Sequence, residues 1–228
     1  MTNIVVLNSV EHRGLRVQAV STEPRNFIGV IVSEFSQLAP HYPILFSKDA
    51  ETGTFYCGAM LGFDTGENLF AEEGARVYRP LNLQRGPFFA AGSELAIDLD
   101  SPKVGSGEVL FGEAGEPTAY LKSMLGLFRD LVPGIERTRI FTQTLLGLKL
   151  IEPIDINVSF DDGTSRALAG LYTINRDALR ELPDAEVLNL FRRGYLELIY
   201  LITASLRQVP ILANKKNSRL LEGVPGLL

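Results

Sequence analysis

The segment from Tyr78 to Phe89 concentrates side chains that can recognise an anion. Its sequence, YRPLNLQRGPFF, holds two arginines among aromatic residues and two prolines. A guanidinium group binds a carboxylate or a phosphate through two parallel hydrogen bonds, and proline restricts the backbone that carries it. We therefore predict a rigid recognition loop; the alternative is a packed connector whose arginines only cover apolar neighbours. The predicted ligand-binding residues are Tyr78, Arg79, Arg85 and Phe88.

The two histidines and the single cysteine offer little further chemistry. His12, Glu34 and His41 could supply two imidazoles and a carboxylate to iron, but their spacing matches no compact ligand motif. Cys57 lies in a strand-like run, TFYCG, which is typical of a small buried side chain. One sulfur cannot form an intramolecular disulfide or a thiolate metal cage. We predict no metal site and no cofactor.

The glycine-rich motifs do not indicate catalysis. The run GSGEVLFG at residues 105–112 leads into strand-like apolar residues, whereas a dinucleotide-binding loop opens a helix. The sequence has no G-x-S-x-G element of a serine hydrolase and no Gly-Lys-Ser or Gly-Lys-Thr of a phosphate-binding loop. We therefore predict no catalytic residues.

The charge balance argues against a nucleic-acid partner. The chain has 22 basic and 27 acidic residues and a net charge of -5. A duplex-binding protein presents a basic face that neutralises phosphates. The largest basic cluster here is Lys215-Lys216 with Arg219 close by, which is too small for such a face. The remaining candidate partners are an unknown protein or a small anionic ligand.

The apolar stretches are short for a secretion signal or a membrane span. Near the N-terminus the apolar run Ile4–Leu7 has four residues and no basic residue before it, and a signal needs roughly 7–15 apolar residues. The most apolar helical stretch, Tyr195–Leu206, carries Glu197 and is shorter than the roughly 20 residues of a span. We expect a cytoplasmic protein without a transmembrane segment.

The hydrophobic pattern predicts strands in the N-terminal half and helices later. Two β-hairpins are expected, residues 43–48 with 54–63 and residues 153–160 with 165–174, because each pair of apolar runs flanks a turn rich in aspartate and glycine. Helical spacing begins near Pro117, is interrupted at Pro133-Gly134 and resumes at 140–150, which predicts a pair of helices. Further helices are expected at about 175–181, 184–192 and 194–208. The predicted fold class is α+β, with a possible subdomain break near residue 116.

Scattered motifs over nearly the whole chain resemble the bacterial SapC family. The resemblance rests on Glu11-His12, Glu34-Phe35, His41-Tyr42-Pro43-Ile44, Asn68-Leu69-Phe70, Tyr78, Pro80, Arg85, Pro87-Phe88, Leu110-Phe111, Gly115-Glu116-Pro117-Thr118 and Gly170-Leu171-Tyr172. The chain has no tryptophan, whereas relatives tend to carry one shortly before the Tyr-x-Pro stretch. The resemblance implies a single SapC-like domain over residues 1–228. It implies no particular reaction.

Three functions are compatible with the sequence and the resemblance. The first is a non-catalytic accessory or binding protein with an unknown ligand. The second is an enzyme, or an accessory component of peptide or sugar modification, acting with the uptake and halogenase systems that tend to be encoded beside the family. The third is a structural protein of the surface layer after which the family is named. The sequence leaves the ligand and the oligomeric state open.

Overall fold

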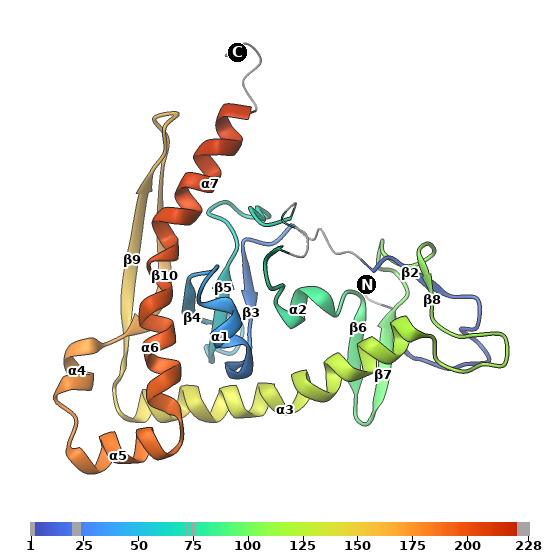
Figure 1. The fold of residues 1–228 in the computed structure, drawn as a ribbon, viewed down its shortest axis with the longest axis horizontal. Coiled ribbons are helices and arrows are strands. Elements are labelled where there is room, and N and C mark those ends of the chain that lie inside the picture. Colours follow the sequence, from blue (N-terminus) through green and yellow to red (C-terminus); the bar gives the residue numbers. More distant parts are fainter. Residues whose placement is uncertain (1–2, 20–23, 72, 74–75, 223–228) are drawn as a thin grey trace. The chain divides into compact units, whose positions relative to one another are not determined.

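The computed structural model describes residues 3–19, 24–71, 73 and 76–222, and the chain divides into two compact units (Figure 1). Unit 1 comprises Met1–Thr22 and Leu81–Ile135, and unit 2 comprises Glu23–Pro80 and Glu136–Leu228. The fold class is α+β, as the sequence predicts. The suggested break near residue 116 falls inside unit 1 and does not coincide with a unit boundary.

Unit 1 is built on a three-stranded antiparallel sheet in the order β1-β7-β6. These strands are β1 (Ile4–Val6), β7 (Glu94–Asp98) and β6 (Phe88–Ala91). A short ladder of β2 (Arg16–Val17) and β8 (Glu108–Val109), the one-turn helix α2 (Leu81–Gln84) and the first part of α3 (Ala119–Gly147) complete the unit. Phe88, Leu95 and Ile97 are buried on one face of the sheet, and the Phe88 ring lies 6.2 Å from the ring of Tyr120 at the start of α3.

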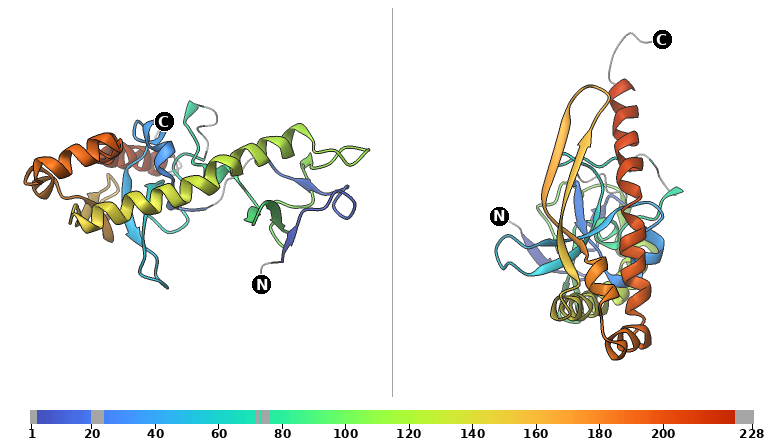
Figure 2. Two further views of the ribbon diagram at one scale, coloured as in Figure 1. Left: turned by 90° about the horizontal axis from the view of Figure 1, so that it is seen from below. Right: turned by 90° about the vertical axis from the view of Figure 1, so that its left-hand side faces the viewer.

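Unit 2 is built on a five-stranded antiparallel sheet in the order β3-β5-β4-β10-β9. Its strands are β3 (Phe27–Gly29), β4 (Ile44–Lys48), β5 (Phe55–Met60), β9 (Ile151–Ser159) and β10 (Ser165–Ile174). Its helices besides the second part of α3 are η1 (Val32–Glu34), α1 (Phe35–Leu38), α4 (Arg176–Arg180), α5 (Asp184–Arg192), α6 (Tyr195–Ser205) and α7 (Gln208–Glu222). Figures 1 and 2 show α7 running beside the β9–β10 hairpin toward its tip.

Both predicted hairpins are confirmed, and their turns follow from aspartate and glycine chemistry. An Asp49 carboxylate oxygen accepts the Thr52 backbone N–H at 2.8 Å, and an Asp162 oxygen accepts the Thr164 N–H at 2.9 Å. Such bonds replace backbone partners that the turn removes. Gly163 follows Asp162 with a φ of 81°, in the left-handed region that favours glycine.

The predicted helix pair is wrong, because α3 is one helix of 29 residues that runs through Pro133. A proline inside a helix removes one backbone hydrogen bond and costs about 3 kcal/mol. The packing of apolar side chains on both sides of Pro133 offsets that penalty: Leu131 is buried in unit 1, and Phe141 and Leu145 are fully buried in unit 2. Local propensity therefore yields to tertiary burial at this position.

Helix α7 was not predicted, and it lengthens the apolar stretch that begins with α6. Within the described chain, residues Tyr195–Leu221 are long and apolar enough to cross a membrane by length and composition alone. The exposed positions of this stretch include Glu197, Arg207 and Asn214 beside Tyr200 and Ile211, a mixture typical of a helix face in water. The cytoplasmic location remains a prediction.

Buried polar atoms tie the helices of unit 2 to its sheet. The Ile44 backbone N–H of β4 donates to the Ser205 hydroxyl of α6 at 2.8 Å, and Ser205 is fully buried. The Cys57 sulfur of β5 lies 3.6 Å from the Thr142 hydroxyl of α3. Burial raises the pKa of the Cys57 thiol to about 12, so the side chain is a small buried group and not a reactive thiolate.

Candidate functional site

The four predicted ligand-binding residues do not form one loop. Tyr78 and Arg79 belong to unit 2, whereas Arg85 and Phe88 belong to unit 1. The segment between them contains α2 and runs into β6. Phe88 is fully buried and can affect a ligand only through the neighbours that it positions. A common ligand for the four residues remains a prediction.

The Arg85 side chain holds the turn between α2 and β6. Its Nη1 donates to the Phe88 carbonyl at 2.6 Å, and its Nε donates to the Asn82 side-chain oxygen at 3.1 Å. Its guanidinium group also lies over the Phe89 ring, 4.5 Å from the ring centre. These contacts position the first residues of β6, and this gives the arginine and aromatic residues of the segment a structural role.

A buried carboxylate holds Tyr78 in unit 2. Glu34 is 2% exposed; one of its oxygens accepts the Ile31 backbone N–H at 3.1 Å and the other accepts the Tyr78 hydroxyl at 3.2 Å. The Tyr42 hydroxyl donates to the Tyr78 carbonyl at 2.9 Å. Burial raises the pKa of the Tyr42 phenol, and the positive charge of Arg79 opposes this shift. The cluster therefore joins the start of η1 to the Tyr78 segment through satisfied polar groups.

The two histidines lie apart from any ligand cluster in the described residues. His12 is in unit 1, where its Nδ1 accepts the Asn8 backbone N–H at 2.9 Å and closes a turn. His41 is in unit 2, beside the ring of Tyr42. Within residues 3–19, 24–71, 73 and 76–222, no three side chains of histidine, cysteine, aspartate or glutamate lie close enough together to hold a metal ion. The predicted absence of metals and cofactors stays a prediction.

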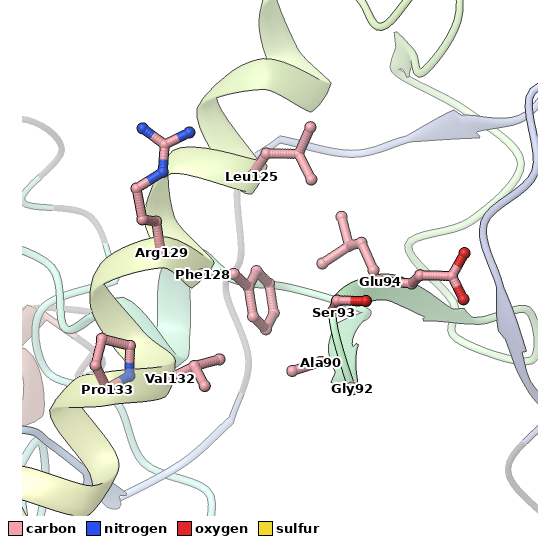
Figure 3. A pocket seen from close by; sticks show the side chains of 10 residues that line it. Ala90, Gly92, Ser93, Glu94, Leu125, Phe128, Arg129, Val132 and Pro133 are labelled. Carbon is pink, nitrogen blue, oxygen red and sulfur yellow. The ribbon is translucent and has the colours of Figure 1, made fainter.

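The candidate functional site is an open groove of about 350 Å³ between the β6–β7 hairpin and α3, within unit 1 (Figure 3). The helix contributes Leu125, Phe128 and Val132, whose side chains in Figure 3 point toward the hairpin. The hairpin contributes Ala90 and Leu95. Phe128 and Leu95 are buried beneath the groove, whereas 41% of Leu125 and 44% of Val132 remain exposed. The groove therefore presents uncovered apolar surface to solvent.

Charged groups lie only at the rim of this groove. Arg129 and Glu94 are its charged lining residues among those described, and Figure 3 shows both side chains directed away from the cavity on opposite sides. Pro133, which also lines the groove, has no N–H to donate to the carbonyl of Arg129 four residues earlier. The groove thus has an apolar floor, one charged group on each of its two sides and a helix carbonyl without its usual helical partner.

Strand β6 forms the edge of its sheet beside the groove, and the backbone groups of one of its residues point away from the sheet. The Asp98 N–H donates to the Pro87 carbonyl at 3.0 Å, and hydrogen-bonded pairs alternate with non-bonded pairs in an antiparallel ladder. The Ala90–Leu95 pair is therefore a non-bonded pair, which agrees with the Leu95 carbonyl accepting instead from the N–H of Leu7, the residue after β1. The N–H and C=O of Ala90 consequently point to the free edge of β6.

Sequence reasoning missed this groove, although the sequence does show the apolar helix face that forms one side of it. Leu125, Phe128 and Val132 repeat at three and four residues, which places them on one helix face. A second apolar row, including Met124 and Leu131, lies beside them and is buried. The sequence predicts an apolar helix face, but it does not tell which of two adjacent rows the sheet leaves uncovered.

A cluster of opposite charges fixes α7 to the loop after β5 in unit 2. Lys216 of α7 has a side chain only 7% exposed and contacts the carboxylates of both Asp64 and Glu67, the latter at 3.0 Å. Arg166 of β10 reaches the other oxygen of Asp64 at 2.5 Å. The Lys216 ammonium also lies 4.9 Å from the centre of the Phe160 ring. These groups satisfy one another, and the cluster holds structure together rather than offering free charges to a ligand.

The same cluster predicts sensitivity to acid. Hydrogen bonds from Arg166 and Lys216 lower the pKa of Asp64 below its usual range. In the neighbouring ion pair of α7, a hydrogen bond from Lys215 lowers the pKa of Glu73 in the same way. Because these folded-state pKa values lie below the unfolded ones, the ionised carboxylates stabilise the fold above about pH 5, and the contribution is lost as the pH falls through the folded values. We expect the free energy of unfolding to fall below about pH 5.

Urea denaturation at a series of pH values measures this effect. Asp64→Asn cannot ionise at that position, so we expect it to be less stable than wild type at neutral pH and to lose less stability on acidification. An equal loss of stability in wild type and variant between neutral and acidic pH would show that Asp64 does not contribute to the acid sensitivity.

The fold and the groove describe a two-unit α+β protein with an open apolar surface on unit 1. Residues 7–212 of the 228 match the SapC family, and the chain therefore belongs to that family. This confirms the resemblance drawn from the sequence motifs. Comparison with curated proteins finds no match, and comparison with solved structures finds none either.

Proposed function

We propose that the protein is a non-catalytic binding protein of the SapC family, and that its ligand is an extended apolar segment of a partner polypeptide. The observation that carries this proposal is the groove of unit 1, whose charges stand on its two opposite sides and whose floor consists of Leu125, Phe128, Val132, Ala90 and Leu95. The described lining holds one hydroxyl, that of Ser93, and no histidine, cysteine or lysine, which suits recognition rather than bond making.

An extended peptide matches the groove better than a helix or a small anion does. A groove of about 350 Å³ holds a few apolar side chains and is too small for the whole apolar face of an amphipathic helix. The outward N–H and C=O of Ala90 offer one pair of main-chain hydrogen bonds to a strand that lies along β6. Glu94 and Arg129 can contact polar peptide residues on either side.

Arg85 acquires a defined part in this proposal. It holds the Phe88 carbonyl at the start of β6, and therefore sets the position of Ala90 two residues later. On this view Arg85 acts as a positioning residue for the groove. We further propose that binding takes place in the cytoplasm.

Selection from a random decapeptide library displayed on phage tests the proposal on the full chain. We expect selected peptides to carry apolar residues at alternate positions, because side chains of an extended strand alternate between two faces. Val132→Asp introduces a charge into the apolar floor at a half-exposed position, and we expect it to weaken binding of the selected peptides by about tenfold or more.

Ile135→Asp is the matched control, since Ile135 lies on the same helix, is 55% exposed and does not line the groove. We expect it to bind the peptides within about twofold of wild type, the scatter usual for surface substitutions. Circular dichroism confirms that both variants remain folded. The absence of any enriched peptide, or an equal effect of the two substitutions, would contradict the proposal.

A further inference from the structure

A second cavity lies on unit 2, and its lining is chemically unlike the groove of unit 1. It has a volume of about 220 Å³ and sits where β3, β4, β5 and β10 meet on one face of the five-stranded sheet. Aromatic and uncharged polar side chains share its wall, and none of its described lining residues carries a charge. Its size corresponds to a single ring rather than to a drug-sized ligand.

An irregularity in β10 opens this cavity. The ladder between β9 and β10 shifts register between Leu168 and Leu171, and Gly170 in the bulge has a φ of 76°. A bulge leaves backbone groups outside the ladder and turns side chains away from the regular pleat. Ala169, inside the bulge, lines the cavity, and the Ser47 hydroxyl lies 3.5 Å from the Gly170 carbonyl. Polar backbone groups therefore border the cavity on this side.

A glycine on β5 creates the aromatic wall. Gly58 faces the Phe27 ring so closely that a Cβ at this position would lie 2.1 Å from Phe27 Cε1. The missing side chain lets the Phe27 ring lie across β5, where it meets the Tyr56 ring edge to face with centres 6.0 Å apart. Tyr56 is 37% exposed. The wall therefore presents a positioned aromatic ring to solvent, with a hydroxyl at its tip.

The polar groups of the cavity can both donate and accept hydrogen bonds. Asn26 lines the cavity, and its side-chain amide makes no hydrogen bond within the part of the chain that the structure describes. An amide, the Ser47 hydroxyl and the Tyr56 hydroxyl each offer a donor and an acceptor. Such groups match ligand hydroxyls, which also do both, whereas a carboxylate or phosphate would find no positive charge in this lining.

We propose that this cavity is a binding site for one neutral, hydroxyl-bearing ring, a sugar residue. The C–H face of the sugar lies against Tyr56, and its hydroxyls bond to Asn26, Ser47 and the backbone of the bulge. The lining supports this class of ligand because it combines an aromatic surface with uncharged groups that donate and accept. The site is independent of the peptide groove that the proposed function uses.

Saturation-transfer NMR on the full chain tests the site with the methyl glycosides of glucose, galactose, mannose and N-acetylglucosamine at millimolar concentration. Glucose 6-phosphate and benzoate serve as a charged sugar and as a planar aromatic anion. We expect at least one neutral glycoside to bind through the protons of one ring face and both anions to give no signal. Asn26→Ala and Tyr56→Ala should each weaken that binding by about tenfold, the value of one lost hydrogen bond or ring contact.

Tyr200→Ala is the matched control, because Tyr200 is a tyrosine of the same unit that is 60% exposed and does not line the cavity. It should leave glycoside binding unchanged. The groove variant Val132→Asp should also leave glycoside binding unchanged, because it affects only the peptide groove. Failure of one proposal is therefore distinguishable from failure of the other. The proposal would be overturned if none of the glycosides bound or if either anion bound more strongly than they do. It would also be overturned if Asn26→Ala and Tyr56→Ala bound the glycoside as well as wild type.

Discussion

Lys216→Ala is expected to destabilise unit 2 by about 2 kcal/mol, a value between those of exposed and of buried ion pairs, because Lys216 is buried whereas Asp64 is 38% exposed. The substitution leaves the carboxylates of Asp64 and Glu67 facing each other without the ammonium that now contacts both. It also removes a cation from the face of the Phe160 ring. Urea denaturation followed by circular dichroism measures the change.

Two further variants separate charge from packing. Lys216→Met keeps an unbranched stem in the same position, so we expect it to lose nearly as much stability as Lys216→Ala if the unpaired carboxylates dominate. Arg180→Ala removes an exposed ion pair, because the Arg180 side chain is 68% exposed and that of Asp177 is 85% exposed. We expect this variant to lose roughly 0.5 kcal/mol of stability. A Lys216→Met protein as stable as wild type would show that the buried contacts make no net contribution.

The position of Lys216 illustrates why the charge cluster could not be read from the sequence. Adjacent lysines such as Lys215 and Lys216 are usually solvated, so the sequence gives no sign that one of them is buried. The helix that carries them was itself not predicted, because it follows α6 directly and carries a polar run, NKKNS, in its middle. Only the fold brings Asp64, 152 residues away, against this helix.

Local chemistry made other parts of the structure predictable. The hairpins around Asp49 and Asp162 follow from alternating strands and short turns, which depend on neighbours in sequence. The burial of Cys57 follows from its strand context. The Tyr78–Phe89 segment has a distinctive composition, but composition does not reveal that Arg85 would use its donors on Asn82 and Phe88. The groove depends on how much of α3 a short sheet covers, and the sequence holds no local signal for that.

The glycine-rich run at residues 105–112 shows the same difference between a motif and its place in a fold. The sequence indicates that it does not open a helix, and the structure places its second glycine directly before β8. Gly107 has a φ of 97°, and its carbonyl accepts a hydrogen bond from Arg16 Nη1 at 3.0 Å. A Cβ on Gly107 would lie 2.5 Å from the Val17 carbonyl oxygen, where β2 pairs with β8. The glycine is therefore required by strand pairing.

Gly107→Ala is accordingly expected to destabilise unit 1 by about 2–4 kcal/mol. An alanine in the left-handed backbone conformation costs about 1–2 kcal/mol, and the displacement of the paired strand accounts for the rest. Gly105→Ala is the matched control: Gly105 has a φ of 111°, but no atom lies within 4 Å of its added Cβ, so only the backbone penalty applies. Amide hydrogen exchange of the peptides that contain β2 and β8 measures the opening of this ladder directly. We expect exchange there to accelerate much more in Gly107→Ala than in Gly105→Ala. Equal acceleration in the two variants would mean that the backbone conformation of this run, and not the close approach of β2 and β8, selects its glycines.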